Sequence, residues 1–165
     1  MKNFILGFLI MIAVLAIGPW GYLRLGLAEV RADVTPPAWE NRLAQFALKA
    51  SVRRSVAQVQ NPMPPTDENL IAGGKLYFGG CVGCHGQPGK HQDTLRAYPA
   101  PPRLAQTGTQ YSEPELFWIV RHGIRNTGMS AYRYSDEETW TLAAFVKRMN
   151  NLPPTVLAGI QPKNP

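Results

Sequence analysis

Cysteine is nearly absent from this chain of 165 residues, which has only two. Two cysteines cannot form the disulfide network that supports a small secreted scaffold. Acidic residues are also scarce, with 11 against 17 Lys and Arg, but the basic excess is concentrated in residues 38–60, which carry a net charge of +3. Because the excess of basic residues is confined mostly to this segment, it does not indicate a nucleic-acid partner. The 15 Gly and 15 Pro follow no period, which excludes collagen and a long coiled coil.

The usual signatures of several enzyme classes are missing as well. The sequence contains no phosphate-binding glycine loop, no nucleophile with an adjacent base and no pair of catalytic carboxylates. No internal repeat is visible either. The length fits one compact domain with accessory segments, and its function has to be read from what the sequence does contain.

One long apolar run is present, over residues 4–23, which carry no charge. As a helix this run reaches about 30 Å, the thickness of the hydrocarbon core of a membrane. Trp20 and Tyr22 lie near its end, where interfacial aromatics are expected. Lys2 precedes the run, and this positive charge favours a cytoplasmic N-terminus, although Arg24 on the far side weakens that bias. The alternative is a cleaved secretory signal with its dense apolar part at residues 4–17 and an exit at residues 26–28 or 30–32, both farther past that part than an ordinary signal places them. We predict a retained single-pass anchor in the cytoplasmic membrane, with the remainder facing the periplasm.

A second segment, this one amphipathic, follows the prolines at positions 36 and 37, which suit the first turn of a helix. Three readings are open: packing of the helix on its own domain with a solvated basic side, contact with a membrane surface, or docking of a partner subunit. The proline-rich residues 61–65 end the segment. Apolar residues recur in it at helical spacing, with basic residues among the polar positions: Trp39, Leu43, Phe46, Ala47 and Ala50, and Arg42, Lys49, Arg53 and Arg54.

The two cysteines form a Cys-x-x-Cys-His motif with His85, at Cys81 and Cys84. This pattern indicates covalent attachment of haem c. Two thiols one helical turn apart can add to the two vinyl groups of a porphyrin, and the adjacent imidazole then meets the iron. A thioredoxin-like pair needs a βαβ pattern, which is not visible, and zinc needs two more ligands, for which His91 and His122 are the histidines available.

A sixth ligand for the iron is offered by Met129, in the polar, Gly-containing loop around residues 126–130. A thioether is a soft donor that raises the reduction potential of haem iron. The ordinary alternative is a methionine that fills a gap in the core, for which such a loop is a poor place. The other methionines lie in the apolar run, before the domain or at the end of a helix: Met1, Met11, Met63 and Met149.

Residues 66–150 resemble the class I c-type cytochromes, in particular the small monohaem members of bacterial respiratory chains. The resemblance rests on Cys-Val-Gly-Cys-His-Gly at 81–86, the Pro-rich stretch at 99–102, Glu-Leu-Phe-Trp-Ile-Val-Arg-His-Gly-Ile at 115–124 and Thr-Gly-Met at 127–129. It implies a single covalent haem c, thioether links at Cys81 and Cys84, and His85 and Met129 as iron ligands.

In this family a carbonyl of the proline region accepts the second ring N–H of the proximal histidine, and Pro99 and Pro101 are the candidates here. Many relatives carry an aspartate in that stretch, where this chain has Arg103, either a propionate partner or a solvated side chain. The family's first and last helices cross closely at a glycine, and Gly73 would admit Phe145 or Trp140 of the last helix.

Local signals independently predict an all-α domain. Thr66 is placed to cap a helix that runs to Phe78. Capping boxes begin at Ser112 and Ser135, and the first of these helices is expected to stop at Gly123. The predicted organisation is an anchor over residues 1–28, the amphipathic helix and linker over 29–65, the cytochrome domain over 66–150 and a Pro-rich tail over 151–165.

Several further residues are better explained without a role at the iron. His122 and His91 are expected to be exposed, and Trp118 either lines the haem crevice or packs on the last helix. Single charges are usually solvated, although a group of them can form a rim for an acidic partner; the candidates are Lys75, Lys90, Arg121 and Arg125.

The predicted function is one-electron transfer by an electron carrier that is not itself an enzyme. Its partners are redox proteins or subunits of an oxidoreductase, with no nucleic acid among them. Two alternatives stay open: a haem-relay subunit of a larger membrane oxidoreductase, and a haem peroxidase or gas sensor with a labile sixth ligand.

Overall fold

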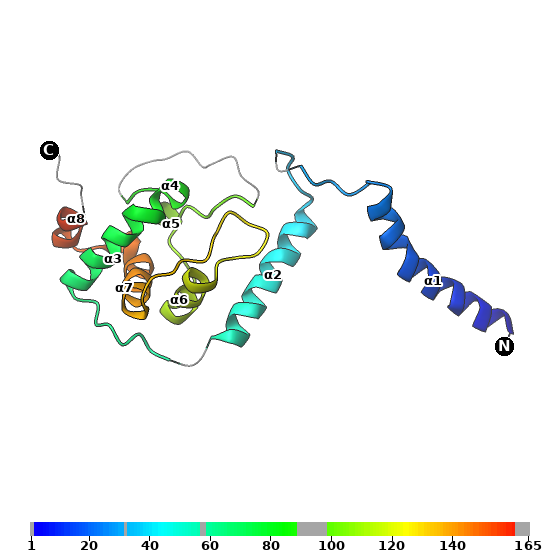
Figure 1. The fold of residues 1–165 in the computed structure, drawn as a ribbon, viewed down its shortest axis with the longest axis horizontal. Coiled ribbons are helices and arrows are strands. Elements are labelled where there is room, and N and C mark those ends of the chain that lie inside the picture. The colour runs from blue at the N-terminus through cyan, green and yellow to red at the C-terminus, as the bar shows by residue number, and fades with distance from the viewer. Residues whose placement is uncertain (1, 32, 57–58, 89–98, 161–165) are drawn as a thin grey trace. The chain divides into compact units, whose positions relative to one another are not determined.

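The structure, a computed structural model, describes residues 2–31, 33–56, 59–88 and 99–160. Every regular element among them is a helix, which confirms the predicted all-α class. The described chain divides into two units, Met1–Val34 and Thr35–Pro165. The helices (Figure 1) are α1 (Lys2–Arg24), α2 (Ala38–Ser55), α3 (Asp67–Gly80), α4 (Val82–His85), α5 (Leu104–Thr107), α6 (Glu113–His122), α7 (Asp136–Arg148), the 3₁₀ turn η1 (Met149–Asn151) and α8 (Pro154–Ile160).

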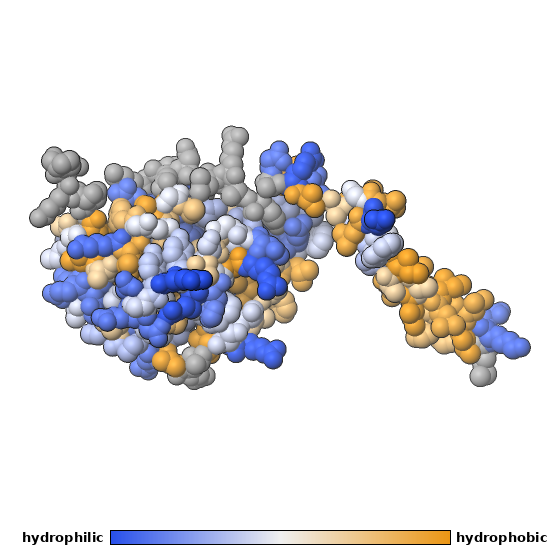
Figure 2. Space-filling model, viewed as in Figure 1, coloured by the Kyte–Doolittle hydropathy of each residue, from blue (hydrophilic) through white to orange (hydrophobic). Residues whose placement is uncertain are grey.

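The first unit consists of α1 and the residues that follow it. This helix matches the predicted span to within two residues at each end, and it buries no residue. It is the one helix in the described part of the chain that is long and apolar enough to cross a membrane, with a mean hydropathy of 2.3. Figure 2 shows its surface as nearly continuous hydrophobic side chains.

In the second unit the central helix is α7, which packs against both α3 and α6. Eight consecutive residues of α7, from Thr139 to Val146, are buried. The close approach to α3 occurs at Gly73, where an added Cβ would lie 2.3 Å from the Thr141 carbonyl oxygen and 3.0 Å from Cβ of Phe145. The predicted crossing at Gly73 is therefore confirmed, with Phe145 at the contact. Trp140 instead stacks on Phe117 of α6, with ring centroids 4.3 Å apart.

We expect Gly73→Ala to lower the free energy of unfolding by about 1–3 kcal/mol, because the new methyl group forces the backbones of α3 and α7 apart. Gly79→Ala is the matched control on the same helix, since nothing lies within 4 Å of a Cβ there. The control should be neutral or stabilise the protein by about 0.5–1 kcal/mol, because alanine favours helix. Urea unfolding of the two variants checks this, and equal stabilities would contradict the close crossing.

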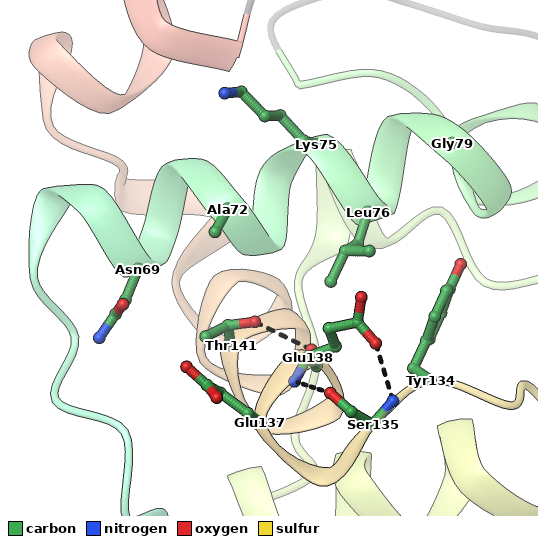
Figure 3. Close-up of a pocket in the computed structure, with 10 residues that line it drawn as sticks. All are labelled: Asn69, Ala72, Lys75, Leu76, Gly79, Tyr134, Ser135, Glu137, Glu138 and Thr141. Carbon is green, nitrogen blue, oxygen red and sulfur yellow. Dashed lines mark hydrogen bonds between the residues drawn. The ribbon is translucent and has the colours of Figure 1, made fainter.

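The starts of the helices are fixed by local capping, as predicted. Thr66 caps α3 by accepting from the Asn69 N–H. Ser135 caps α7: its hydroxyl accepts from the Glu138 N–H at 3.1 Å, and its own N–H donates to the Glu138 carboxylate at 2.8 Å (Figure 3). Ser112 forms the same box at the start of α6, and α6 ends before Gly123, whose φ is +65°.

A helix that the sequence analysis does not anticipate is α8, in the stretch expected to be a Pro-rich tail. Val156 and Ile160 are buried, and α8 packs on α3. The fit depends on Gly74, where an added Cβ would lie 2.4 Å from Cγ2 of Ile160. Pro154 begins the helix, a position where the missing N–H has no cost.

Helix α2 packs on α6 through a face that the sequence pattern does not single out. Val52 is fully buried, and Leu48, one turn before it, is half-buried. The residues expected to form the apolar face are exposed: Trp39 by 65%, Leu43 by 60% and Phe46 by 72%. For packing on its own domain, the face that the sequence pattern selects is the wrong one. Leu48 and Val52 form a second, shorter apolar row on the opposite side of the helix, and this is the row that is wholly or partly buried.

Candidate haem-attachment site

The Cys-x-x-Cys-His motif lies at the junction of α3 and α4. Cys81 ends α3, with its N–H bonded to the Tyr77 carbonyl at 2.8 Å, and its own carbonyl accepts from the N–H groups of Cys84 at 3.1 Å and His85 at 2.9 Å. This single turn sets the two thiols three residues apart on neighbouring positions of a helix. Cys81 is buried, Cys84 is exposed, and neither is in a disulfide.

The ring of His85 is held by the proline-rich segment before α5. Its Nδ1 lies 2.8 Å from the Pro102 carbonyl oxygen. Because a carbonyl only accepts, Nδ1 carries the hydrogen, and Nε2 of the neutral ring is left with its lone pair for a metal. The expected carbonyl support is present, but Pro102 supplies it, and the candidates Pro99 and Pro101 are wrong. The start of α5, where the Leu104 N–H bonds to the same Pro102 oxygen at 2.9 Å, sets this register.

Met129 lies in the loop between α6 and α7, as predicted, and is partly buried against the core. The loop is closed by three hydrogen bonds: the Ile124 N–H to the Met129 carbonyl at 2.9 Å, the Thr127 hydroxyl to the Ile124 carbonyl at 2.8 Å, and the Met129 N–H to the Thr127 hydroxyl at 3.0 Å. Gly123 admits the loop, since an added Cβ would lie 2.6 Å from the Met129 carbonyl oxygen. The backbone of Met129 is therefore fixed, although the residue lies outside any helix.

Tyr77, which the sequence analysis gives no role at the site, ties α3 to the end of the motif. Its ring is fully buried, and its hydroxyl donates to the Gly86 carbonyl at 2.6 Å. Gly86 has a φ of +87°, which favours glycine and turns the chain away after His85. An aromatic residue one helical turn before the first cysteine is the signal that points to such a contact.

The alternative of a reactive redox pair finds no support in the environment of the thiols. Burial, and secondarily the nearby Cys84, raises the pKa of Cys81 to about 11. Redox-active Cys-x-x-Cys pairs depend on the opposite, a pKa lowered so that a thiolate forms. No βαβ unit is present in the described chain, which is helical. Zinc also lacks support, because no three His, Cys, Asp or Glu side chains gather among the described residues.

Tyr77→Phe should lower the free energy of unfolding near neutral pH by about 1–3 kcal/mol, since the buried Gly86 carbonyl loses its donor. Burial raises the pKa of Tyr77, so its neutral ring contributes stability below the unfolded pKa of about 10, and that contribution is lost as pH rises through the folded pKa. The deficit of the variant should therefore shrink above about pH 10. Urea titrations at several pH values test this, and a deficit that stays constant to high pH would contradict it.

Of the remaining candidates, Arg121 has a structural role: it donates to the Tyr134 carbonyl at 3.0 Å, pairs with Asp136, and lies over the Phe117 ring. His122 is exposed as expected, and its ring lies 4.9 Å from that of Trp118 on the same helix. Arg103 is half-buried and not fully solvated. Lys75 and Arg125 are exposed, and His91 and Lys90 lie outside the described residues.

A surface groove of about 810 Å³ lies between α3 and the start of α7 (Figure 3). Lys75 and Leu76 line it from α3, and Tyr134 and Glu137 line it from the other side. No residue of the Cys-x-x-Cys-His motif contributes to it, and two of its polar side chains, Ser135 and Glu138, form the cap of α7. The groove is therefore separate from the attachment site.

An all-helical fold around a Cys-x-x-Cys-His turn, with the histidine held by a proline-region carbonyl, defines the segment as a c-type cytochrome domain. Such a domain binds haem c covalently, by thioether bonds between two cysteines and the porphyrin, and transfers electrons through the haem iron. Residues 68–146 match the family model described as cytochrome c oxidase, cbb3-type, subunit III. No solved structure gives a significant match to the chain.

Proposed function

We propose that this protein is a membrane-tethered one-electron carrier whose iron is ligated by His85 and Met129, with the domain on the periplasmic side. The contact of His85 Nδ1 with the Pro102 carbonyl carries this proposal. It selects the tautomer that a metal-bound histidine requires, and the carbonyl raises the basicity of the ring.

The residues present fit a covalent haem by their chemistry. Two free thiols stand on one helical turn, and an oriented imidazole follows directly. Partly buried apolar side chains lie at the edge of the core beside the turn, among them Val82, Leu104 and Ala105. When bound, the haem supplies a metal centre that accepts and releases one electron.

In this proposal each residue of the chain has a separate part. Cys81 and Cys84 would hold the porphyrin by thioether bonds, and the His85 Nε2 and the Met129 thioether would be the protein ligands of the iron. A soft sulfur ligand favours the reduced iron and raises the reduction potential. An iron with two protein ligands would leave no coordination site for a substrate, which supports electron transfer over catalysis at the iron.

The family match favours a second candidate, in which the domain relays electrons inside a larger membrane oxidoreductase. The matched family is a subunit of an oxidase, and α1 would hold the domain beside such a complex. The two candidates share one haem chemistry and differ in whether a partner stays attached. Gentle detergent extraction followed by identification of co-purifying proteins separates them: a monodisperse monomer supports the free carrier.

A redox titration of the purified holoprotein, followed by its visible spectrum, tests the proposed ligation. We expect a reversible one-electron transition, a low-spin ferric spectrum and a sulfur-to-iron charge-transfer band. High-spin ferric iron at neutral pH, or carbon monoxide binding to the untreated ferrous protein, would instead support the enzyme or gas-sensor alternative.

The membrane orientation is tested separately. Lys2 is the first residue of α1, before its apolar run, and positive charge at a membrane entry favours the cytoplasmic side. A reporter fused at the C-terminus that is active only after export should be active. An inactive reporter would overturn the periplasmic assignment and leave the haem chemistry unaffected.

A further inference from the structure

The exposed side of α2 carries a row of large apolar side chains that no described residue covers. Trp39, Leu43 and Phe46 are 65%, 60% and 72% exposed. At 100° per residue they fall within about 60° of one another around the helix, and Ala50 continues the same row. We call Trp39, Leu43, Phe46, Ala47 and Ala50 the apolar row; hydrophobic surface is visible along α2 in Figure 2.

Basic side chains border the apolar row. Arg42 and Lys49 lie along one side of it, and Arg53 and Arg54 flank its C-terminal end. All four are exposed. A strip of Trp, Leu and Phe bordered by long cationic side chains is typical of a helix that lies in the plane of a bilayer. There the rings enter the acyl boundary, and Lys and Arg extend to the phosphates.

The opposite side of the same helix faces the cytochrome domain, where Val52 is fully buried and α2 packs on α6. The helix thus packs on the domain by one face, while the apolar row on the other is left uncovered by the described residues. A peptide or protein partner would have to match a basic border with acidic groups. An anionic lipid surface offers that charge everywhere, and the chain carries its own candidate membrane span in α1. Residues 25–37 join α1 to α2 and, fully extended, reach at most about 45 Å.

We propose that the apolar row of α2 docks onto the surface of an anionic phospholipid bilayer, so that α2 is the second membrane contact of a tethered cytochrome domain. This inference rests on the proposed membrane tether. Because α2 is packed on α6, docking would orient the whole domain relative to the membrane, which a flexible tether alone does not do. The ligand chemistry is the phosphate surface of anionic lipid together with its acyl boundary.

The test uses the full-length holoprotein in vesicles, with a fluorophore on one introduced cysteine. The native cysteines carry haem and do not react, so Ala50→Cys places the probe in the apolar row. Ala44→Cys is the matched control, also exposed and about 120° around the helix. In vesicles rich in phosphatidylglycerol, doxyl-labelled lipid should quench the probe at position 50 more strongly than at 44. Aqueous iodide should show the reverse order.

Two further variants in the Ala50→Cys background separate the apolar and the ionic contributions. Leu43→Ser with Phe46→Ser should abolish lipid quenching. Arg42→Gln with Lys49→Gln should lower the ratio of docked to free helix about five-fold for each charge removed. Pure phosphatidylcholine or high salt should have the same effect as removing the charges. These side chains are exposed, so folding should be unaffected, and the haem spectrum verifies it.

Equal quenching at positions 44 and 50 would overturn the proposal. Shielding of position 50 from both lipid and iodide would also overturn it, because that result means that a second copy of the chain covers the apolar row. Resistance of the vesicle-bound protein to alkaline carbonate reports insertion of α1 independently. Failure of the tether, of haem ligation and of α2 docking would therefore be three distinguishable results.

Discussion

Replacing both thiols, Cys81→Ala with Cys84→Ala, should abolish the haem that survives denaturation. No other cysteine exists in the chain to form a thioether. The mass of the exported protein should fall to that of the bare polypeptide, and a haem stain of the denaturing gel should be negative. The domain should also lose most of its stability, because a small helical domain without its covalent prosthetic group buries little apolar surface.

Gly83→Ala is the control between the two cysteines. Gly83 is exposed and nothing lies within 4 Å of an added Cβ, so this variant should retain haem. Each single cysteine variant should retain at most one thioether and a less stable holoprotein. Wild-type protein with no added mass of haem size would contradict the attachment site altogether.

The sequence predicts the parts of this fold that depend on local chemistry. The boxes at Ser112 and Ser135 and the cap at Thr66 involve residues three positions apart, so their formation requires no knowledge of the tertiary structure. The apolar α1 is equally local, because its composition alone sets it. The crossing at Gly73 was expected from the family resemblance, and it appears where only a residue without a Cβ fits.

What the sequence does not predict depends on contacts between distant segments. Pro102 rather than Pro99 or Pro101 meets His85, because the position of α5 sets the register of the proline stretch. The sequence of residues 153–160 is typical of a Pro-rich tail. The structure shows a packed helix there, because Gly74 leaves room for the Ile160 side chain. In α2 the periodicity identifies an apolar row, but periodicity does not tell whether protein or another medium covers it.

The position of Met129 also depends on contacts that the sequence pattern does not show. Met129 is held by backbone hydrogen bonds within its loop and by the close approach over Gly123. These contacts hold the Met129 backbone in one position. A backbone held in this way would lower the entropic cost of iron ligation by the Met129 side chain, which supports Met129 as the proposed sixth ligand.

Replacement of Met129, the proposed sixth ligand, is expected to have the second large effect. Met129→Ala should convert the ferric protein to high-spin or water-ligated iron, remove the charge-transfer band and allow carbon monoxide to bind the ferrous form. Its reduction potential should fall by roughly 0.1–0.3 V, part of the range of about 0.8 V that axial ligands span, because the soft donor that favours ferrous iron is gone. A spectroscopic redox titration measures all of these changes in one sample.

Met63→Ala is the matched control, a partly buried methionine that precedes α3 and lies outside the loop. It should leave the spectrum and the potential unchanged. That result would show that losing a methionine elsewhere in the chain does not change the iron. Met129→His tests the role of ligation itself: a second imidazole should restore low-spin iron at a potential below that of the wild type, since nitrogen is the harder donor. If Met129→Ala keeps the wild-type spectrum, Met129 is a core side chain, and the iron takes its sixth ligand from elsewhere in the chain.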